Sequence, residues 1–168
     1  MEHRNGPTLW YFGYGSNTER GTFLGRRRMR PVEVRVGRLD DFELRFDLGV
    51  GSGERGVANV AARDGDHVWG VLWRITGNGA QRLDRTEGVH RGFYRRLAVE
   101  VTTPDGGRVP AFTYHSLRGR PGRKPSRRYL GLLLAGARQH GLPEDWIVRL
   151  RGFELARDER RAHQGGLL

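Results

Sequence analysis

Residues 95–116 read RRLAVEVTTPDGGRVPAFTYHS, and this stretch decides the class of fold. Leu97, Val99 and Val101 alternate with polar or small residues, which is the period of a strand with one buried face. Residues 104–107 have the composition of a tight turn, and a second apolar run follows them. A β-hairpin with two antiparallel strands is therefore predicted.

Other segments extend this pattern along the chain. Residues 56–76, GVANVAARDGDHVWGVLWRIT, place two apolar runs around Asp64-Gly65 and are a second hairpin candidate. Three shorter stretches are predicted to be strands, at 8–15, 32–39 and 42–46. Helices are expected directly after Gly15, over 79–87, over 126–139, and within LPEDWIVRLRGF at 142–153; the third is apolar nearly all round, as core helices are.

Strands grouped in hairpins, with helices between the groups, indicate an α+β fold with a largely antiparallel sheet. Such a sheet can curl into a barrel. A single domain is expected over residues 8–155, because 168 residues suffice for one core and no linker or repeat interrupts them. Residues 1–7 and 156–168 are expected to be flexible termini.

The composition limits the partners of the protein. The formal net charge is +11, but Lys124 is the single lysine among 30 basic residues, so the charge reflects a general arginine bias and nucleic-acid binding is not favoured. The absence of cysteine excludes disulfides, thiolate zinc sites and a cysteine nucleophile, and it suits a reducing compartment. No signal-peptide pattern or apolar run of transmembrane length occurs. A cytoplasmic protein without a membrane partner is expected.

The first predicted strand runs into the turn GYGSN at 13–17. Tyr14 stands where a nucleophile elbow needs glycine, and Thr18 stands where a dinucleotide fingerprint needs it. Ser16 and Glu19 have the spacing of a capping box, which predicts a helix start near Asn17. The free amides of the turn could then hold a carboxylate or an oxyanion. The alternative is a plain strand-to-helix turn.

Glu87 falls on the buried face of the helix predicted over 79–87. Ala80, Leu83 and Glu87 lie at i, i+3 and i+7 of that helix. A carboxyl group in apolar surroundings has a raised pKa and suits general acid–base chemistry near neutral pH. Asp84 is the rival carboxylate, on a side predicted to be more exposed. The alternative for Glu87 is a frayed helix end paired with Arg91.

The six histidines show no ligand spacing, so no metal site is predicted. His90 is the only histidine close in sequence to a candidate site residue, and it is interpreted as a surface residue.

Several stretches in combination resemble the γ-glutamylcyclotransferase family, over roughly residues 9–150. In chain order they are YFGYGSN, RLDDFELRF, DHVWGVLWRI, LDRTEGV with GFY shortly after it, and PSRRYLGLLLAGARQHGLP. The resemblance implies a small mixed, largely antiparallel β-barrel flanked by helices. It also implies that Glu87 is the catalytic acid/base, and that the substrate contacts Tyr14, Gly15, Ser16, Asn17, Thr18, Tyr94 and Tyr129.

The implied reaction converts a γ-glutamyl amide into 5-oxoproline and a free amine, with no metal or organic cofactor. Its nucleophile is the α-amine of the substrate, which agrees with a chain that has no cysteine. A base removes a proton from the α-ammonium, and the same group later protonates the leaving amine. The amides of residues 15–18 would stabilise the carbonyl oxygen as it becomes anionic. The substrate is expected to be a γ-glutamyl amine, a dipeptide or a γ-glutamyl-protected biosynthetic intermediate.

Two features depart from the family pattern. Thr18 and Glu19 follow the turn where many members have apolar residues, and the loop SLRGRPGRKPSRR leading into the predicted core helix is unusually basic. The basic residues at 118–128 suggest an acidic carrier protein that presents the substrate; the alternative is a solvated face. A competing interpretation from another class is a non-catalytic binding module of the same fold that recognises an acidic partner. Either a monomer or a homodimer is compatible with the sequence.

Overall fold

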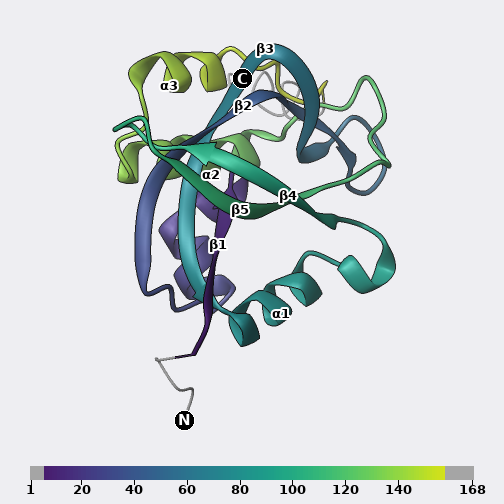
Figure 1. Cartoon of the computed structure of the whole chain (residues 1–168). Coiled ribbons are helices and arrows are strands. Elements are labelled where there is room, and N and C mark those ends of the chain that lie inside the picture. Colours follow the sequence, from purple (N-terminus) through teal and green to yellow (C-terminus); the bar gives the residue numbers. More distant parts are fainter. Residues whose placement is uncertain (1–5, 158–168) are drawn as a thin grey trace.

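The computed structural model describes residues 6–157. Five strands form a closed barrel in the order β1-β3-β2-β4-β5 (Figure 1). Neighbouring strands are antiparallel except β1 and β5, which run parallel and close the barrel. The predicted mixed, largely antiparallel barrel of an α+β fold is thereby confirmed. The strands are β1 Thr8–Gly13, β2 Glu33–Gly49, β3 Gly56–Thr76, β4 Arg95–Thr102 and β5 Arg108–His115.

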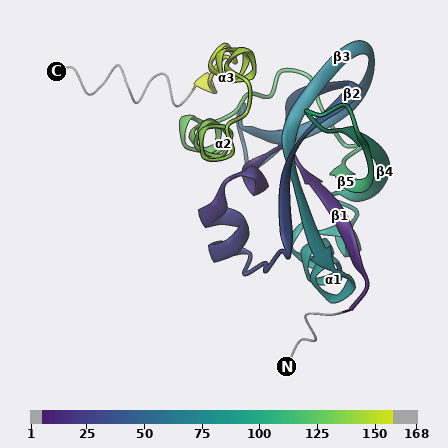
Figure 2. The same ribbon diagram turned by 60° about the vertical axis from the view of Figure 1, so that its left-hand side comes forward.

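Helices cover two ends of this barrel. Helices α2 and α3 pack against each other, while α1 lies at the opposite end of the barrel from α3 (Figure 2). Side-chain caps begin two of them: Thr76 accepts from the Gly79 amide before α1, and Ser126 accepts from the Tyr129 amide before α2. The helices are α1 Gly77–Thr86, α2 Arg127–Gln139 and α3 Glu144–Arg151, with short turns η1 Ser16–Thr18, η2 Gly21–Arg26 and η3 Val89–Arg91.

The longest strands differ from their prediction. Residues 56–76 form one strand rather than a hairpin, because both halves pair with β2, and β2 likewise runs unbroken through 32–39 and 42–46. The two strands bend together where Asp41 and Gly65 adopt positive φ angles of 63° and 80°. The Gly65 amide donates to the Asp41 carboxylate there at 2.9 Å. These residues, typical of a turn, therefore produce a bulge in a continuing ladder. The other predicted hairpin, β4–β5, is confirmed.

The capping box predicted at Ser16 and Glu19 is wrong, although a short helix does follow Gly15. No side chain caps η1. Glu19 instead accepts from the amides of Gly21 and Thr22, at 2.8 and 2.6 Å, and so begins η2. Helix η2 has π geometry, in which the Arg27 amide donates to the Thr22 carbonyl five residues earlier. The helix that the carboxylate caps is thus the second of the two.

Two apolar clusters fill the domain. One includes Phe12, Leu72 and Leu133 and joins the barrel to α2 and α3, and the other includes Tyr11, Phe23 and Leu83 and lies beneath α1. Tyr14 belongs to the first cluster and Tyr11 to the second, so the end of β1 lies where the clusters meet.

The packed chain reaches slightly beyond the predicted domain end. Ala156 is fully buried, and its amide donates to the Pro125 carbonyl at 2.9 Å. The rest of the two predicted flexible termini, at 1–5 and 158–168, lies outside the described residues. Among the helices of residues 6–157, none combines the length and apolar composition needed to cross a bilayer.

Candidate active site

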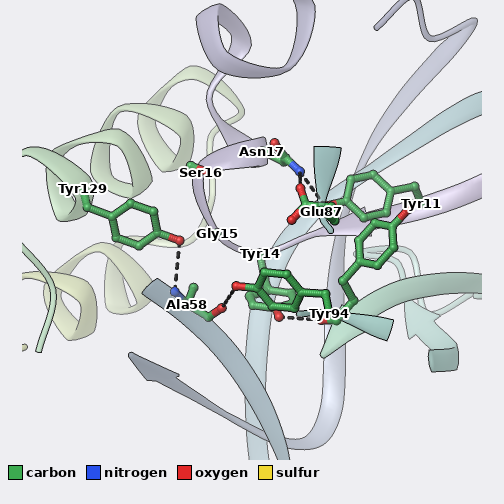
Figure 3. A pocket seen from close by; sticks show the side chains of 10 residues that line it. Tyr11, Tyr14, Gly15, Ser16, Asn17, Ala58, Glu87, Tyr94 and Tyr129 are labelled. Carbon is green, nitrogen blue, oxygen red and sulfur yellow. Dashed lines mark hydrogen bonds between the residues drawn. The ribbon is translucent and has the colours of Figure 1, made fainter. Parts of the chain in front are cut away.

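A small pocket of about 40 Å³ lies at the end of β1 (Figure 3). Every predicted site residue except Thr18 lines it, although the chain delivers them from four separate regions. Turn η1 follows β1, Glu87 ends α1, Tyr94 precedes β4, and Tyr129 belongs to α2. The lining residues are Tyr11, Tyr14, Gly15, Ser16, Asn17, Ala58, Glu87, Tyr94, Tyr114 and Tyr129.

Glu87 is the buried carboxylate of this pocket. It occupies the C-cap position of α1, on the face that Ala80 and Leu83 bury, and its side chain is only 10% exposed. Burial raises its pKa, and the Arg27 guanidinium and the Asn17 amide oppose that shift. Glu87 pairs with Arg27, at 3.6 Å, in place of the alternative partner Arg91.

Asn17 connects Glu87 to the rest of the site. Its amide nitrogen donates to Glu87 Oε1 at 2.8 Å and to the Tyr11 hydroxyl at 2.9 Å. Its carbonyl oxygen accepts from Arg27 Nε at 2.7 Å, and its backbone carbonyl accepts from the Trp73 indole at 3.0 Å. Both hydrogens of the side-chain amide are thus used inside the protein. The Asn17 side chain therefore orients the carboxylate, and its contacts leave Oε2 of Glu87 as the oxygen open to a substrate.

Thr18 lies behind the turn rather than in the pocket. Its hydroxyl and its amide both donate to the Gly15 carbonyl, at 2.7 and 3.1 Å, and the residue is buried. The cradle of free amides that the sequence suggested over residues 15–18 consequently excludes the Thr18 amide.

The five tyrosines of the pocket fall into two groups. Three hydroxyls donate to protein oxygens at 2.5 Å: Tyr14 to the Tyr114 carbonyl, Tyr94 to the Ala58 carbonyl, and Tyr114 to Asp84. The hydroxyls of Tyr11 and Tyr129 are acceptors in their hydrogen bonds, from the Asn17 side chain and the Ala58 amide. Their own O–H groups therefore remain available as donors to a ligand.

These two available hydroxyls keep their protons at neutral pH. Burial raises the pKa of Tyr129 to about 12, while the Ala58 amide and the nearby Ser16 groups partly oppose the shift. Burial and the Glu87 charge raise the pKa of Tyr11 further above its ordinary value. Each is thus a neutral hydrogen-bond donor facing the pocket.

The rival carboxylate, Asp84, is hydrogen-bonded to other side chains of the protein. It accepts from the Tyr114 hydroxyl and, at 2.8 Å, from Arg96 Nε, and its side chain is more exposed than that of Glu87, as predicted. It does not line the pocket. Asp84 therefore positions the Tyr114 hydroxyl, whereas Glu87 lines the cavity.

Sequence reasoning missed Tyr11, Ala58, Tyr114 and Arg27. Alternation along β1 could have placed Tyr11 on the same face as Gly13, beside the turn. Nothing local marks Arg27, since its contact with Glu87 joins residues far apart in the chain.

No group of three or more potential metal ligands gathers within the described part of the chain. His90 is exposed, which confirms its interpretation as a surface residue.

Part of the basic loop serves the fold. The Arg123 guanidinium donates to the backbone carbonyls of Gly53 and Arg55, at 2.6 and 3.2 Å, and so braces the end of the β2–β3 pair. Lys124 pairs with Glu154 at 3.2 Å. These two cations are therefore engaged by their own chain.

Comparison with known proteins shows the family to which this chain belongs. Residues 67–150 match the AIG2-like family. A protein of Mus musculus named gamma-glutamylcyclotransferase is 34% identical over 157 residues, which cover 90% of this chain and 81% of the mouse protein. The chain belongs to the γ-glutamylcyclotransferase family. It is accordingly an enzyme of that type, as its resemblance predicted.

Two further relatives agree with this assignment. A Homo sapiens protein of the same name is 33% identical over 150 residues, covering 86% of this chain and 78% of the human one. A solved structure titled gamma-glutamyl cyclotransferase superposes with a TM-score of 0.78 at 29% identity, covering 89% of both chains. The similarity thus covers much more of the chain than the segment matched by the family.

Proposed function

We propose that the enzyme cyclises the γ-glutamyl group of a γ-glutamyl amine or dipeptide to 5-oxoproline and releases the free amine. The observation that carries this proposal is Glu87: a carboxylate with a raised pKa, held at one oxygen by Asn17 inside a pocket lined by tyrosines. Membership in the cyclotransferase family supports the reaction class.

The first step makes the nucleophile. Oε2 of Glu87 accepts a proton from the α-ammonium of the substrate, and a carboxyl pKa raised by burial brings its basicity closer to that task. The neutral α-amine then attacks the γ-carbonyl carbon. A new C–N bond closes the five-membered ring, and the carbonyl electrons move to the oxygen.

The second step breaks the original amide. The anionic oxygen accepts hydrogen bonds from the available hydroxyls of Tyr11 or Tyr129 and from the turn beginning at Gly15. Its electrons return to the carbon, the bond to the leaving amine breaks, and a proton passes from Glu87 to that amine. The ring nitrogen still carries two hydrogens after the attack, and it loses one of them through Glu87 to the released amine. 5-Oxoproline and the protonated amine result, and the carboxylate is restored.

The pocket also shapes the substrate for this reaction. Both reacting groups belong to one glutamyl chain, so folding that chain until amine and carbonyl meet removes much of the entropic barrier. Tyr14 and Tyr94, whose hydroxyls are fixed by backbone carbonyls, supply rigid walls against which the chain can fold.

The decisive experiment follows 5-oxoproline release from a panel of γ-glutamyl dipeptides and amines. Glu87→Gln is expected to lower kcat by about 10²–10⁴-fold, because an amide cannot move the proton. Asp84→Asn should retain activity, since an amide oxygen can still accept from Tyr114. Release of 5-oxoproline by Glu87→Gln at the parent rate would refute the assignment. If the parent protein bound the γ-glutamyl compounds but converted none of them, the binding-module alternative would be favoured.

A further inference from the structure

A second, larger pocket adjoins the catalytic one. Its volume is about 220 Å³, and three segments form it: the end of η2, the turn between β2 and β3, and the first turns of α2. Arg26, Arg55 and Arg128 line it together with apolar side chains that include Val57 and Leu132.

The two pockets share one lining side chain and are lined by residues that are neighbours in the sequence. Tyr129 lines both of them. Val57 of the second pocket directly precedes Ala58 of the first, and Arg26 directly precedes Arg27, which contacts Glu87. Figure 3 shows Tyr129 and Glu87 on opposite sides of the catalytic pocket. A substrate whose reacting amide lies near Glu87 would reach the second pocket if its leaving group extended along Tyr129, the side chain that lines both pockets.

The second pocket has one sign of charge. Three arginines line it, and the described residues of its lining include no carboxylate. The arginines are exposed, so their field acts partly through solvent and is sensitive to salt. A guanidinium matches a carboxylate with two parallel hydrogen bonds, and the guanidinium groups of Arg26 and Arg128 together exceed what a single carboxylate requires.

We propose that this pocket binds the leaving amine and selects an amino acid with an acidic side chain. The proposal rests on the cyclotransferase function above and adds the class of leaving group. The amino acid enters with two carboxylates, its own α-carboxylate and that of its side chain, and Arg26 and Arg128 bind them. Val57 and Leu132 contact the methylene groups between the two charges.

The test compares two substrates of nearly equal shape, γ-glutamylglutamate and γ-glutamylglutamine. At low ionic strength the parent is expected to show a kcat/KM about tenfold higher for the acidic dipeptide, which corresponds to one charge-assisted contact. Added salt should reduce this preference. The double variant Arg26→Met, Arg128→Met should lose more activity on the acidic dipeptide than on the neutral one, bringing the ratio close to one. Arg151→Met, on α3 and outside both pockets, should keep the parent ratio.

Binding measured without turnover separates this proposal from the proposed function. Calorimetric titration of Glu87→Gln with the same two dipeptides should show tighter binding of the acidic one, and the added arginine substitutions should remove the difference. Equal affinities, or a preference that survives the double variant, would overturn the pocket assignment. If no γ-glutamyl compound yields 5-oxoproline, the proposed function fails, and the titrations still decide whether the pocket prefers an acidic ligand.

Discussion

Asn17 donates to Glu87 Oε1 at 2.8 Å, and this single bond joins residues that lie 70 positions apart. Arg27 approaches the same oxygen. The protein therefore fixes the carboxylate from one side only. The position of Glu87 depends on the end of β1 as much as on α1, which carries it.

Removing Arg27 should shift the pH dependence of the reaction. The Arg27 charge lowers the pKa of Glu87, so Arg27→Met should raise that pKa and move the acidic limb of the kcat/KM profile to higher pH. This prediction is checked by measuring kcat/KM between about pH 4 and 9, a range that includes the ordinary pKa values of carboxyl and histidine groups. Arg30→Met is the control, and Arg27→Lys, which keeps the positive charge, should show a smaller shift than Arg27→Met. If the acidic limb of the kcat/KM profile of Arg27→Met lay at the same pH as in the parent, Arg27 would serve only to hold Asn17.

At neutral pH the Glu87 carboxylate should destabilise the folded state. Its folded pKa is raised above the ordinary value of 4.5, so the folded state binds the proton more tightly than the unfolded chain. The stabilisation from this proton is fully present below pH 4.5 and is lost as pH rises through the folded pKa. Glu87→Gln should therefore raise Tm at pH 7 and change it little at pH 4.

Each 1 kcal/mol of stability corresponds to about 2–4 °C in a domain of this size. Thermal unfolding of parent and variant at both pH values measures the effect. Glu100→Gln, at an exposed position on β4, is the matched acid-to-amide control and should show no such gain. A variant less stable than the parent at pH 7 would contradict the prediction.

Two glycines of α2 should respond oppositely to alanine. A Cβ at Gly136 would come within 2.4 Å of Thr18 Oγ1 and 2.8 Å of the Thr18 backbone, so the turn that carries Ser16 and Asn17 must move. Gly136→Ala should lower both Tm and kcat/KM. Gly131 faces open space, and Gly131→Ala should stabilise the helix by up to about 1 kcal/mol with activity retained. Equal effects of the two changes on activity would argue against tight packing of α2 on the turn.

The Asp66–Arg149 pair should make the attachment of α3 dependent on pH. Arg149 donates to both carboxylate oxygens, at 2.7 and 2.8 Å, and these hydrogen bonds lower the pKa of Asp66 to about 2. The stabilisation is present above the ordinary value of 3.8 and is lost as pH falls toward 2. Asp66→Asn should cost about 1 kcal/mol at pH 7, a modest figure because Arg149 is partly exposed.

Urea unfolding at neutral pH and near the folded pKa of about 2 checks this prediction, and the difference between parent and variant should shrink at the lower pH. Asp40→Asn removes the more exposed pair with Arg38 and should cost less than Asp66→Asn at neutral pH. A cost for Asp66→Asn that is independent of pH would point to lost packing instead.

Local periodicity predicted most of the architecture. The alternation of Leu97, Val99 and Val101 and the spacing of Ala80, Leu83 and Glu87 each report which face is buried, and both predictions hold in the structure. Periodicity failed at Asp41 and Gly65, because a turn and a bulge use the same residues and only the partner strand distinguishes them.

The site was harder to predict where it depends on long-range contacts. The turn at 13–17 and Glu87 carry local signals, namely glycines and a carboxylate on an apolar face. Arg27 and Tyr114 carry none, since their contacts with Glu87 and Asp84 appear only when the barrel closes. The capping box failed because two adjacent helices compete for one glutamate, and the backbone of the second satisfied it.

The π geometry of η2 determines which arginine reaches the carboxylate. Arg26 lines the outer pocket and Arg27 contacts Glu87, although the two are consecutive. Deleting one residue between 21 and 26 would convert the wide turn into an ordinary α-helical one and rotate the following side chains by about 100°. The number of residues in this segment therefore decides whether a guanidinium lies beside the Glu87 carboxylate.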